Sequence, residues 1–572
     1  MITRRDQAIV GALVLALVAV GTVIAQPVPA PVVSAPESTP LPTVEVPTYR
    51  EGILGRPVTV TPLTARTRAE RTLVGLLFSG LTRIGPDGLP RPDLAATWSS
   101  SEGGKVWTFR IRPDVTWHDG TPVTAADVVY TVSALKDPDA PGPAAASWAE
   151  VTARAVDDLT VRFTLTNPLS AVPEAASQPL LPAHLLADVP VAELADDPFN
   201  EHPIGTGPYT LEALDVDVAY LESTALHPPV QPSPSAEGNG LATVAPGSVS
   251  DVAVPYLPRI ELHFFEDPVA LEDAFRAGEV HVASGLPTGD AAALAADVDD
   301  GQVIRYPSTT LTAVLLDQRP THAELRDARV RRALLGALDR DALILGPLGG
   351  GGLRADVPYP PTAPHYDPDV VTRVAFDVEA ATKLLTEAAW TKGEGGWIAP
   401  GRTDPYRIEL LTPTAEVNPS VHAVATAIAA AWTSFGIGVD VVELDPIQLG
   451  TRLEDGTFGA TVVDIRLGAD LDLYPLLASS QSKTGGGNVT RYQDPGLDVL
   501  LAEARSARGA VARRAAVEAL LTKLAADVPV LPLAWRDDSI AVQGIDGVLP
   551  RLIVDVGDRF SDVLSWRLAS DR

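Results

Sequence analysis

Apolar residues alternate with polar ones in several short segments of the chain. In residues 105–112, KVWTFRIR, large apolar side chains occupy every second position, which predicts a strand that is buried on one face. The same alternation recurs in residues 161–165 and 260–264. The uninterrupted apolar run at residues 314–316 predicts a strand that is buried on both faces. The chain is therefore expected to contain strands of both kinds.

Helical periodicity begins shortly after the first of these strands. Residues 124–127, TAAD, have the spacing of a capping box, with Asp127 in place of the usual glutamate. Apolar residues then recur at every third or fourth position, as on the buried face of a helix. The same pattern predicts helices at residues 69–78, 377–389, 420–435 and 510–526. Strands are expected on both sides of the helix at 420–435, and this strand–helix–strand unit indicates an α/β fold.

Four stretches of the sequence match, in order, the consensus of one protein family. The first, residues 92–135, contains the words WHDG and TAADV, and the second, residues 203–209, reads PIGTGPY. The third and fourth cover residues 310–344 and 459–477. With these motifs the chain resembles the extracytoplasmic solute-binding proteins of peptide-type (dipeptide and oligopeptide, family 5) ABC importers. The glycines and proline of PIGTGPY suit a crossing of two backbones where side chains would clash, so we interpret this motif as structural.

The resemblance implies a fold and a domain organisation. The expected fold is α/β and two-lobed, of the periplasmic-binding-protein type (type II, in its large three-domain form), with a hinge and a cleft between the lobes. Lobe I would be discontinuous and consist of residues 49–73, 204–267 and 532–572. Residues 74–203 would form an inserted domain, and residues 268–531 would form lobe II.

The N-terminal segment predicts a location outside the cytoplasmic membrane. Arg4 and Arg5 precede an apolar run that ends at residue 25, as in an export signal. The run is also just long enough to cross a membrane, so residues 1–25 are interpreted either as a signal peptide or as an N-terminal membrane anchor. Residues 26–48 are rich in proline and are expected to be an extended tether. The folded part would then be periplasmic or at the cell surface.

Composition narrows the chemistry that is open to the protein. The chain has 73 acidic and 44 basic residues, a net charge of -29, which argues against binding to nucleic acid because that requires clustered lysine and arginine. There is no cysteine, which excludes disulfides, thiolate metal sites and cysteine nucleophiles. The nine histidines never have the spacing HxxxH, and no GxSxG or phosphate-binding loop motif is present. We therefore expect no cofactor, no bound metal and no catalysis.

The stretch at residues 459–477 supplies the candidate ligand-binding residues. In peptide-binding relatives an aspartate here pairs with the α-ammonium group of the ligand, and the resemblance implies Asp470 or Asp472 for this role. The aromatic residue that usually accompanies that aspartate is absent, and Arg466 lies nearby. Arg466 offers the opposite possibility, in which the ligand carries an anionic group and the aspartates balance the arginine.

Three further candidates come from other parts of the resemblance. Ser79 and Gly80 fall in a segment that lies near the main chain of the ligand in relatives, and Asp317 ends the fully buried strand, where relatives often have asparagine.

Residues 227–255 are of low complexity and are expected to form a mobile loop. They replace a strand and a turn that relatives carry, and they are the clearest departure from the family pattern.

The sequence thus predicts an extracytoplasmic binding protein that captures a small solute, foremost a peptide, and delivers it to an ABC importer. Its expected partners are the ligand and the permease subunits in the membrane, and we expect it to act as a monomer. Two alternatives stay open. One is a membrane-anchored sensor or interaction module on the same fold, and the other is a hydrolase, which no motif supports.

Overall fold

The computed structural model describes residues 46–137, 148–224 and 256–569. The predicted export or anchor segment, nearly all of the proline-rich tether and the predicted loop at residues 227–255 lie outside the described residues. None of the described helices is both long enough and apolar enough to cross a membrane.

The largest sheet has eleven strands and contains both parallel and antiparallel pairs. Its order is β17 (Gly438–Leu444), β16 (Arg407–Pro413), β18 (Ala460–Arg466), β12 (Gln302–Leu316), β19 (Leu531–Val542), β11 (Val282–Ser284), β1 (Thr48–Leu54), β10 (Arg259–Phe265), β9 (Val218–Ser223) and β8 (Tyr209–Leu214), and β13 (Gly352–Arg354) also pairs with β19. We call β17, β16 and β18 the β18 part of the sheet. We call β11, β1, β10, β9 and β8 the β1 part.

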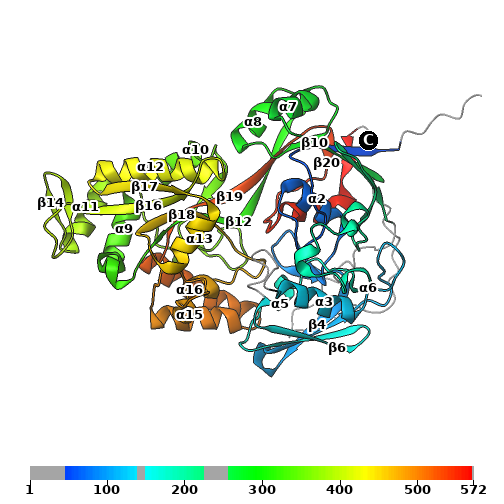
Figure 1. Ribbon diagram of the computed structural model, residues 1–572, viewed down its shortest axis with the longest axis horizontal. Helices are drawn as coiled ribbons and strands as arrows, with labels where there is room; N and C mark the ends of the chain where they lie inside the picture. The colour runs from blue at the N-terminus through cyan, green and yellow to red at the C-terminus, as the bar shows by residue number, and fades with distance from the viewer. Residues whose placement is uncertain (1–45, 138–147, 225–255, 570–572) are drawn as a thin grey trace, which may run out of the picture. The chain divides into compact units, whose positions relative to one another are not determined.

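Two long antiparallel strands, β12 and β19, connect these two parts (Figure 1). β12 pairs with β18 through Thr310 to Leu316, while β19 pairs with β11 through Ile540 to Val542. Their mutual register shifts between Pro307 and Leu311. The strand predicted around residues 314–316 is therefore confirmed, but it is much longer than the apolar run, because it extends from one part of the sheet into the other.

Each part of the sheet has its own hydrophobic core. Val314 and Leu316 of β12 face a core that includes Trp432, while Ala313 and Leu315 on the opposite face pack in a core that includes Leu521. Both faces of this strand are thus buried, as its continuous apolar run predicts. The β1 part packs against a third core.

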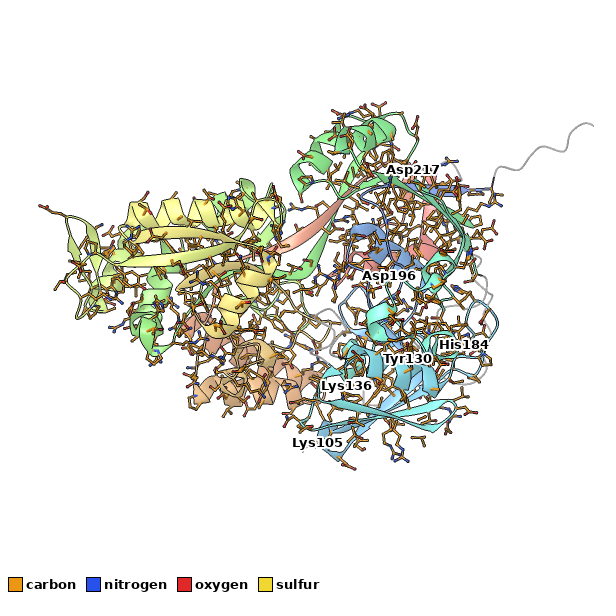
Figure 2. All side chains as sticks on the ribbon, in the orientation of Figure 1. Lys105, Tyr130, Lys136, His184, Asp196 and Asp217 are labelled. Atoms are coloured by element: carbon orange, nitrogen blue, oxygen red, sulfur yellow. The ribbon has the colours of Figure 1, made fainter. Side chains whose placement is uncertain are left out.

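A second, four-stranded antiparallel sheet lies in the first half of the chain. Its order is β4 (Ala95–Ser101), β5 (Val106–Ile111), β7 (Thr160–Leu165) and β6 (Val151–Asp157). The α3 helix (Ala125–Leu135) is tied to its surroundings by two side chains labelled in Figure 2: the Tyr130 hydroxyl donates to the Leu186 carbonyl at 2.7 Å, and Lys136 Nζ donates to the Val151 carbonyl at 2.9 Å. This sheet falls within residues 74–203, although the limits proposed for the lobes and the inserted domain stay predictions.

Capping residues mark the ends of two of the predicted helices. Asp127 accepts a hydrogen bond from the Thr124 amide at 2.8 Å, which confirms the capping box at the start of α3. Gly436 ends α12 (Pro419–Phe435) in the left-handed conformation, with φ 105°. The other α-helices are α2 (Arg68–Leu77), α5 (Val172–Ala175), α6 (Ala183–Leu186), α7 (Pro268–Arg276), α8 (Thr288–Ala296), α9 (Ala328–Gly336), α10 (Arg340–Leu345), α11 (Val378–Glu387), α13 (Pro446–Asp455), α14 (Tyr474–Leu477), α15 (Pro495–Ser506) and α16 (Ala510–Asp527).

The PIGTGPY and WHDG motifs bind to each other. The His118 amide donates to the Gly205 carbonyl at 2.9 Å, and the Gly205 amide donates to His118 Nδ1 at 3.2 Å. Gly207 in turn donates to the carbonyl of Leu77, at the end of α2, at 2.8 Å. The structural interpretation of the glycine motif is therefore confirmed, since a Cβ atom on Gly205 would lie 1.7 Å from the Leu77 oxygen.

Candidate functional site

A cavity of about 470 Å³ lies between α2, the end of β18 and the 3₁₀-helix η7 (Val556–Ser565). Its volume falls in the range of pockets that bind small molecules. Its apolar lining includes Leu63, Val74, Leu135, Trp148, Pro179 and Leu467, and its charged lining consists of Arg66, Arg71, Arg466, Asp555 and Asp558. α2 and η7 belong to the core of the β1 part, while Arg466 ends a strand of the β18 part, so both parts contribute to the site.

Two arginines in this cavity converge on one carboxylate. Arg71 Nε lies 3.3 Å from Asp555 Oδ2, and Arg466 Nη1 lies 3.8 Å from the same oxygen. Burial lowers the pKa of Arg466, and the nearby charge of Arg71 lowers it further. A lowered arginine pKa is the mark of a positive charge that its surroundings do not fully compensate.

Asp558 is held by the backbone at the start of η7. Its Oδ2 accepts hydrogen bonds from the amides of Val554 and Asp555, both at 2.8 Å, as part of the capping box of η7. Burial, followed by the charge of Asp555, raises the pKa of Asp558 to about 6. The Asp558 carboxylate is thus already engaged by the backbone.

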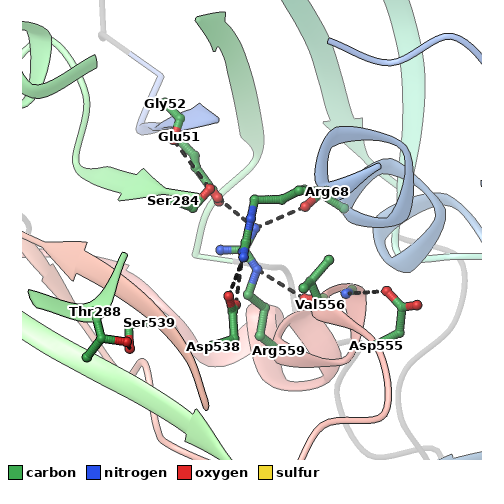
Figure 3. A network of polar contacts seen from close by, with 12 residues as sticks. Glu51, Gly52, Arg68, Ser284, Thr288, Asp538, Ser539, Asp555, Val556 and Arg559 are labelled. Atoms are coloured by element: carbon green, nitrogen blue, oxygen red, sulfur yellow. Dashed lines mark hydrogen bonds and ion pairs between the residues drawn. The ribbon is translucent and has the colours of Figure 1, made fainter. Parts of the chain in front are cut away.

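The position of η7 is fixed by a buried ion pair. Arg559 Nη2 donates to Glu51 Oε1 of β1 at 2.6 Å (Figure 3). It also donates to Thr72 Oγ1 of α2 at 3.1 Å. The side chains of Arg559 and Glu51 are both fully buried. This contact attaches the C-terminal segment to the first strand and the first helix, and it thereby places Asp555 beside Arg71.

A second cavity of about 320 Å³ adjoins the first and shares part of its lining. The two meet at Gly75 of α2 and Gly557 of η7, where the backbones approach so closely that a Cβ atom on Gly75 would lie 2.6 Å from the Gly557 Cα atom. Ser79 and Gly80 line the second cavity. The Ser79 amide donates to Thr206 Oγ1 at 3.1 Å, so this segment is held by the PIGTGPY motif.

The predicted site residues have different environments. Arg466 lines the first cavity, and Ser79 and Gly80 line the second. Asp317, in contrast, is fully buried in an ion pair with Arg319, at 2.5 Å, and the described lining of neither cavity includes it. Its proposed contact with a ligand stays a prediction.

Asp470 and Asp472 follow the Arg466 segment, but the described lining of neither cavity contains them. Asp472 Oδ2 lies 3.0 Å from Arg505 Nε, and its side chain is only 9% exposed. Its Oδ1 accepts from the Tyr474 amide at 2.9 Å, and Asp470 Oδ1 accepts from the Asp472 amide at 3.4 Å. Asp472 is thus engaged inside the protein, and a role for either aspartate in ligand binding remains a prediction.

The state of Asp472 leads to a prediction for stability. Burial raises the pKa of Asp472 to about 6, although Arg505 acts in the opposite direction. The folded protein therefore binds the proton of the Asp472 carboxyl group more tightly than the unfolded chain does. The resulting contribution to the free energy of unfolding is complete below about pH 4 and is lost as the pH rises through about 6. We expect this group to lower the free energy of unfolding by about 2–3 kcal/mol between these limits. In Asp472→Asn that decrease should be absent when unfolding by urea is measured from pH 4 to pH 7, and parallel pH curves for the two proteins would contradict the raised pKa.

The sequence did not indicate several residues of the first cavity. Arg71 lies in a helix without a family motif, and Trp148 lies between α3 and β6, outside the motifs. Asp555 and Asp558 lie beyond the last segment that resembles the family. Gly557, which lies between Asp555 and Asp558, is a residue of this segment that could have indicated a close backbone approach. Their convergence depends on tertiary contacts between segments about 480 residues apart, such as the Arg71–Asp555 pair.

Comparison with known families identifies the family of the chain. The family described as "Bacterial extracellular solute-binding proteins, family 5 Middle" matches residues 90–488. The chain belongs to this family. The recognition made from the sequence motifs is therefore confirmed, and the family is one of solute-binding proteins.

Family 5 members of known function and structure align with nearly the whole chain. The oligopeptide-binding protein AppA of Bacillus subtilis is 25% identical over 512 residues, which cover 86% of each chain. A structure of AppA from Bacillus subtilis in complex with a nonapeptide matches with a TM-score of 0.67 at 23% identity, over 92% of this chain and 99% of that one. NikZ from Campylobacter jejuni, in complex with Ni(L-His), matches with a TM-score of 0.66 at 21% identity, over 91% and 99%. These structures confirm the predicted α/β, two-lobed type II fold.

One of these neighbours, NikZ, was solved with a nickel complex. Among residues 46–137, 148–224 and 256–569, no group of three or more His, Asp or Glu side chains is placed to hold a metal ion. The charged lining of the cavity is instead dominated by arginine, which does not bind metal ions because it has no acceptor atom.

Proposed function

We propose that this protein captures a small solute, foremost a peptide, outside the cytoplasmic membrane and delivers it to the permease subunits of an ABC importer. The observation that carries the proposal is the 470 Å³ cavity, which is lined by residues from both the β1 part and the β18 part of the large sheet. Membership of family 5 supports the same role. We propose further that the protein acts as a monomer, requires no cofactor, does not bind nucleic acid and releases its solute chemically unchanged.

Closure around the solute follows from the connection between the two parts. β12 and β19 join them, and the register shift between Pro307 and Leu311 is a natural place for bending. A solute that contacts Arg71 on one side and Arg466 on the other makes its full set of contacts only when the two sides are close together. Such a solute shifts the equilibrium toward the closed form by the difference in its affinity for the two forms.

Contacts between α5, which packs in the core of the β1 part, and the helices next to the β18 part would also stabilise the closed form. Glu174 of α5 forms an ion pair with Arg513 of α16 at 2.6 Å, and the Glu174 side chain is only 5% exposed. Close by, the Ser170 amide donates to the Arg505 carbonyl at 2.6 Å. Both contacts would break on opening, so they favour the closed form together with the solute.

A peptide is the proposed solute because AppA, which is similar over 86% of its length, is an oligopeptide-binding protein. The lining of the first cavity is suited to such a molecule, since it combines apolar side chains with charged groups. The export or anchor segment predicted at residues 1–25 would place the folded part outside the membrane.

Mass spectrometry of the solute that co-purifies with the full chain tests this function. We expect peptides to be released when the protein is denatured, and we expect added peptide to change the fluorescence of Trp148, which is buried in the cavity lining. In a Trp148→Phe variant the fluorescence change should be reduced, while calorimetry should still detect binding. Release of a non-peptide solute alone would refute the peptide part of the proposal, and the absence of any bound or bindable solute would refute solute capture.

A further inference from the structure

The two arginines that face the first cavity have few partners within the protein. Arg71 and Arg466 each lie near Asp555, but at 3.3 and 3.8 Å, and neither side chain donates a hydrogen bond to another described residue. Their side chains are only 21% and 35% exposed. A guanidinium group has five N–H donors, so the cavity holds two partly desolvated groups with most of their donors available.

The charge of the cavity lining is positive although the protein is strongly acidic. Three arginines, Arg66, Arg71 and Arg466, stand against Asp555 and Asp558, in a chain whose net charge is -29. Asp558 is already bound by two backbone amides. Asp464, the other carboxylate that acts on Arg466, accepts a hydrogen bond from Thr312 Oγ1 at 2.5 Å. Asp555 is the carboxylate that lies within ion-pair distance of both Arg71 and Arg466, so it is their main counter-charge.

We infer that this cavity binds its solute through an anionic group, foremost a carboxylate, held between Arg71 and Arg466. The inference rests on the proposed function and specifies the chemistry of the solute. Guanidinium groups bind carboxylates through short, charge-assisted hydrogen bonds that are frequently bidentate. Asp555, which is 36% exposed, is the protein's own carboxylate between the two arginines.

The apolar side chains that line the cavity indicate the chemistry of the solute beyond its anionic group. Val74, Leu135 and Trp148 are all buried and apolar and line the same cavity as the two arginines. A solute with an apolar body and one acidic end would cover these side chains and place its anionic group on the arginines. A peptide with apolar side chains and a free C-terminus has this chemistry, and so does an arylalkyl carboxylic acid.

This arrangement also couples the anion to closure. Arg71 belongs to α2 of the β1 part, and Arg466 ends β18 of the β18 part, so an anion between them contacts both parts at once. The positive charges of the two arginines repel each other when the anion is absent, as the lowered pKa of Arg466 indicates. The anion removes this repulsion in the closed form only, which makes it the differential contact that closure requires.

Calorimetric titration with three forms of one peptide tests the inference. The full chain, freed of bound solute, is titrated with trileucine, with its N-acetyl derivative and with its C-terminal amide. We expect the first two, which carry a free carboxylate, to bind equally well, and the amide to bind about ten- to a hundredfold more weakly. Arg466→Gln should weaken the binding of both acids by the same factor and leave the amide unaffected, while Arg466→Lys should restore part of the affinity.

Matched variants separate this chemistry from general effects. Arg407→Gln removes an arginine from an exposed ion pair with Asp440 on the β18 part, and it should leave every affinity unchanged. Asp470→Asn and Asp472→Asn test the opposite assignment: a loss of affinity for trileucine, but not for its N-acetyl derivative, would support an ammonium site. If the N-acetyl derivative binds weakly and the amide binds as tightly as the free acid, an ammonium site is present, and the inference is overturned while peptide capture stands.

Failure of all three peptides would instead remove the peptide from the proposed function. Two further probes, 4-phenylbutyrate and inorganic phosphate, then decide the inference by itself. Binding of either probe that is lost in Arg466→Gln supports an anion site for a non-peptide solute. If the two probes also fail to bind, the inference is overturned together with the peptide proposal.

Discussion

Replacement of Arg559 by methionine is expected to destabilise the protein by about 3–5 kcal/mol, because it removes one partner of a fully buried ion pair. The Glu51 carboxylate would remain at 0% exposure without its cation, and the hydrogen bond that it accepts from the Tyr49 hydroxyl at 2.7 Å would not compensate the charge. Figure 3 shows that the same guanidinium also contacts the Val556 carbonyl. The free energy of unfolding in urea measures this effect.

Two variants test whether the effect comes from the uncompensated charge. Arg407→Met makes the same substitution in an ion pair that is exposed to solvent, and it should leave the stability nearly unchanged because such pairs contribute little. Combining Arg559→Met with Glu51→Gln removes both charges and should recover more than half of the loss. If the double variant is as unstable as the single one, the lost packing of the arginine side chain, and not its charge, is the cause.

The Arg559 variant is also expected to bind the solute more weakly. η7 carries Asp555 and Asp558, and it adjoins α2 where Gly75 and Gly557 meet. Without the contacts from Arg559 to Glu51 and Thr72, η7 loses its attachment to β1 and α2. We therefore expect weaker solute binding even at temperatures at which the variant remains folded.

The sequence predicted the elements of the fold that depend on local patterns. Alternation along residues 105–112 indicates β5, the TAAD capping box indicates the start of α3, and the apolar spacing of residues 420–435 indicates α12. Each of these depends on physical chemistry within a few residues, such as the hydrogen bond from the Thr124 amide to Asp127. The family motifs added the overall architecture, because their order along the chain is specific to one fold.

The candidate site could be predicted only in part. Arg466, Ser79 and Gly80 line cavities, whereas Asp472 is paired with Arg505, 33 residues further along the chain. No local pattern distinguishes an aspartate that faces a cavity from one that is paired with a distant arginine, because the difference lies in tertiary packing. For the same reason the sequence does not indicate that Arg71 and Asp555 meet.

Replacement of Gly205 by alanine is expected to cost about 3 kcal/mol, at the upper end of what overpacking usually costs, because the added methyl group meets backbone and not a movable side chain. Its Cβ atom would lie 1.7 Å from the carbonyl oxygen of Leu77. The Gly205 amide and carbonyl are both bonded to His118, so the segment cannot shift without breaking these bonds. α2 ends at Leu77, and its displacement would also disturb Ser79 in the second cavity.

Gly450 provides the matched control for this substitution. It lies within α13, has no atom within 4 Å of an added Cβ, and its φ is not left-handed. Alanine at this position should therefore stabilise the protein by about 0.5–1 kcal/mol, because glycine is a poor helix former. Urea unfolding of the two variants should thus give changes of opposite sign. Equal stability of Gly205→Ala and the wild type would show that the crossing of the PIGTGPY motif over the end of α2 is looser than the structure indicates, and that the glycines of this motif serve another purpose.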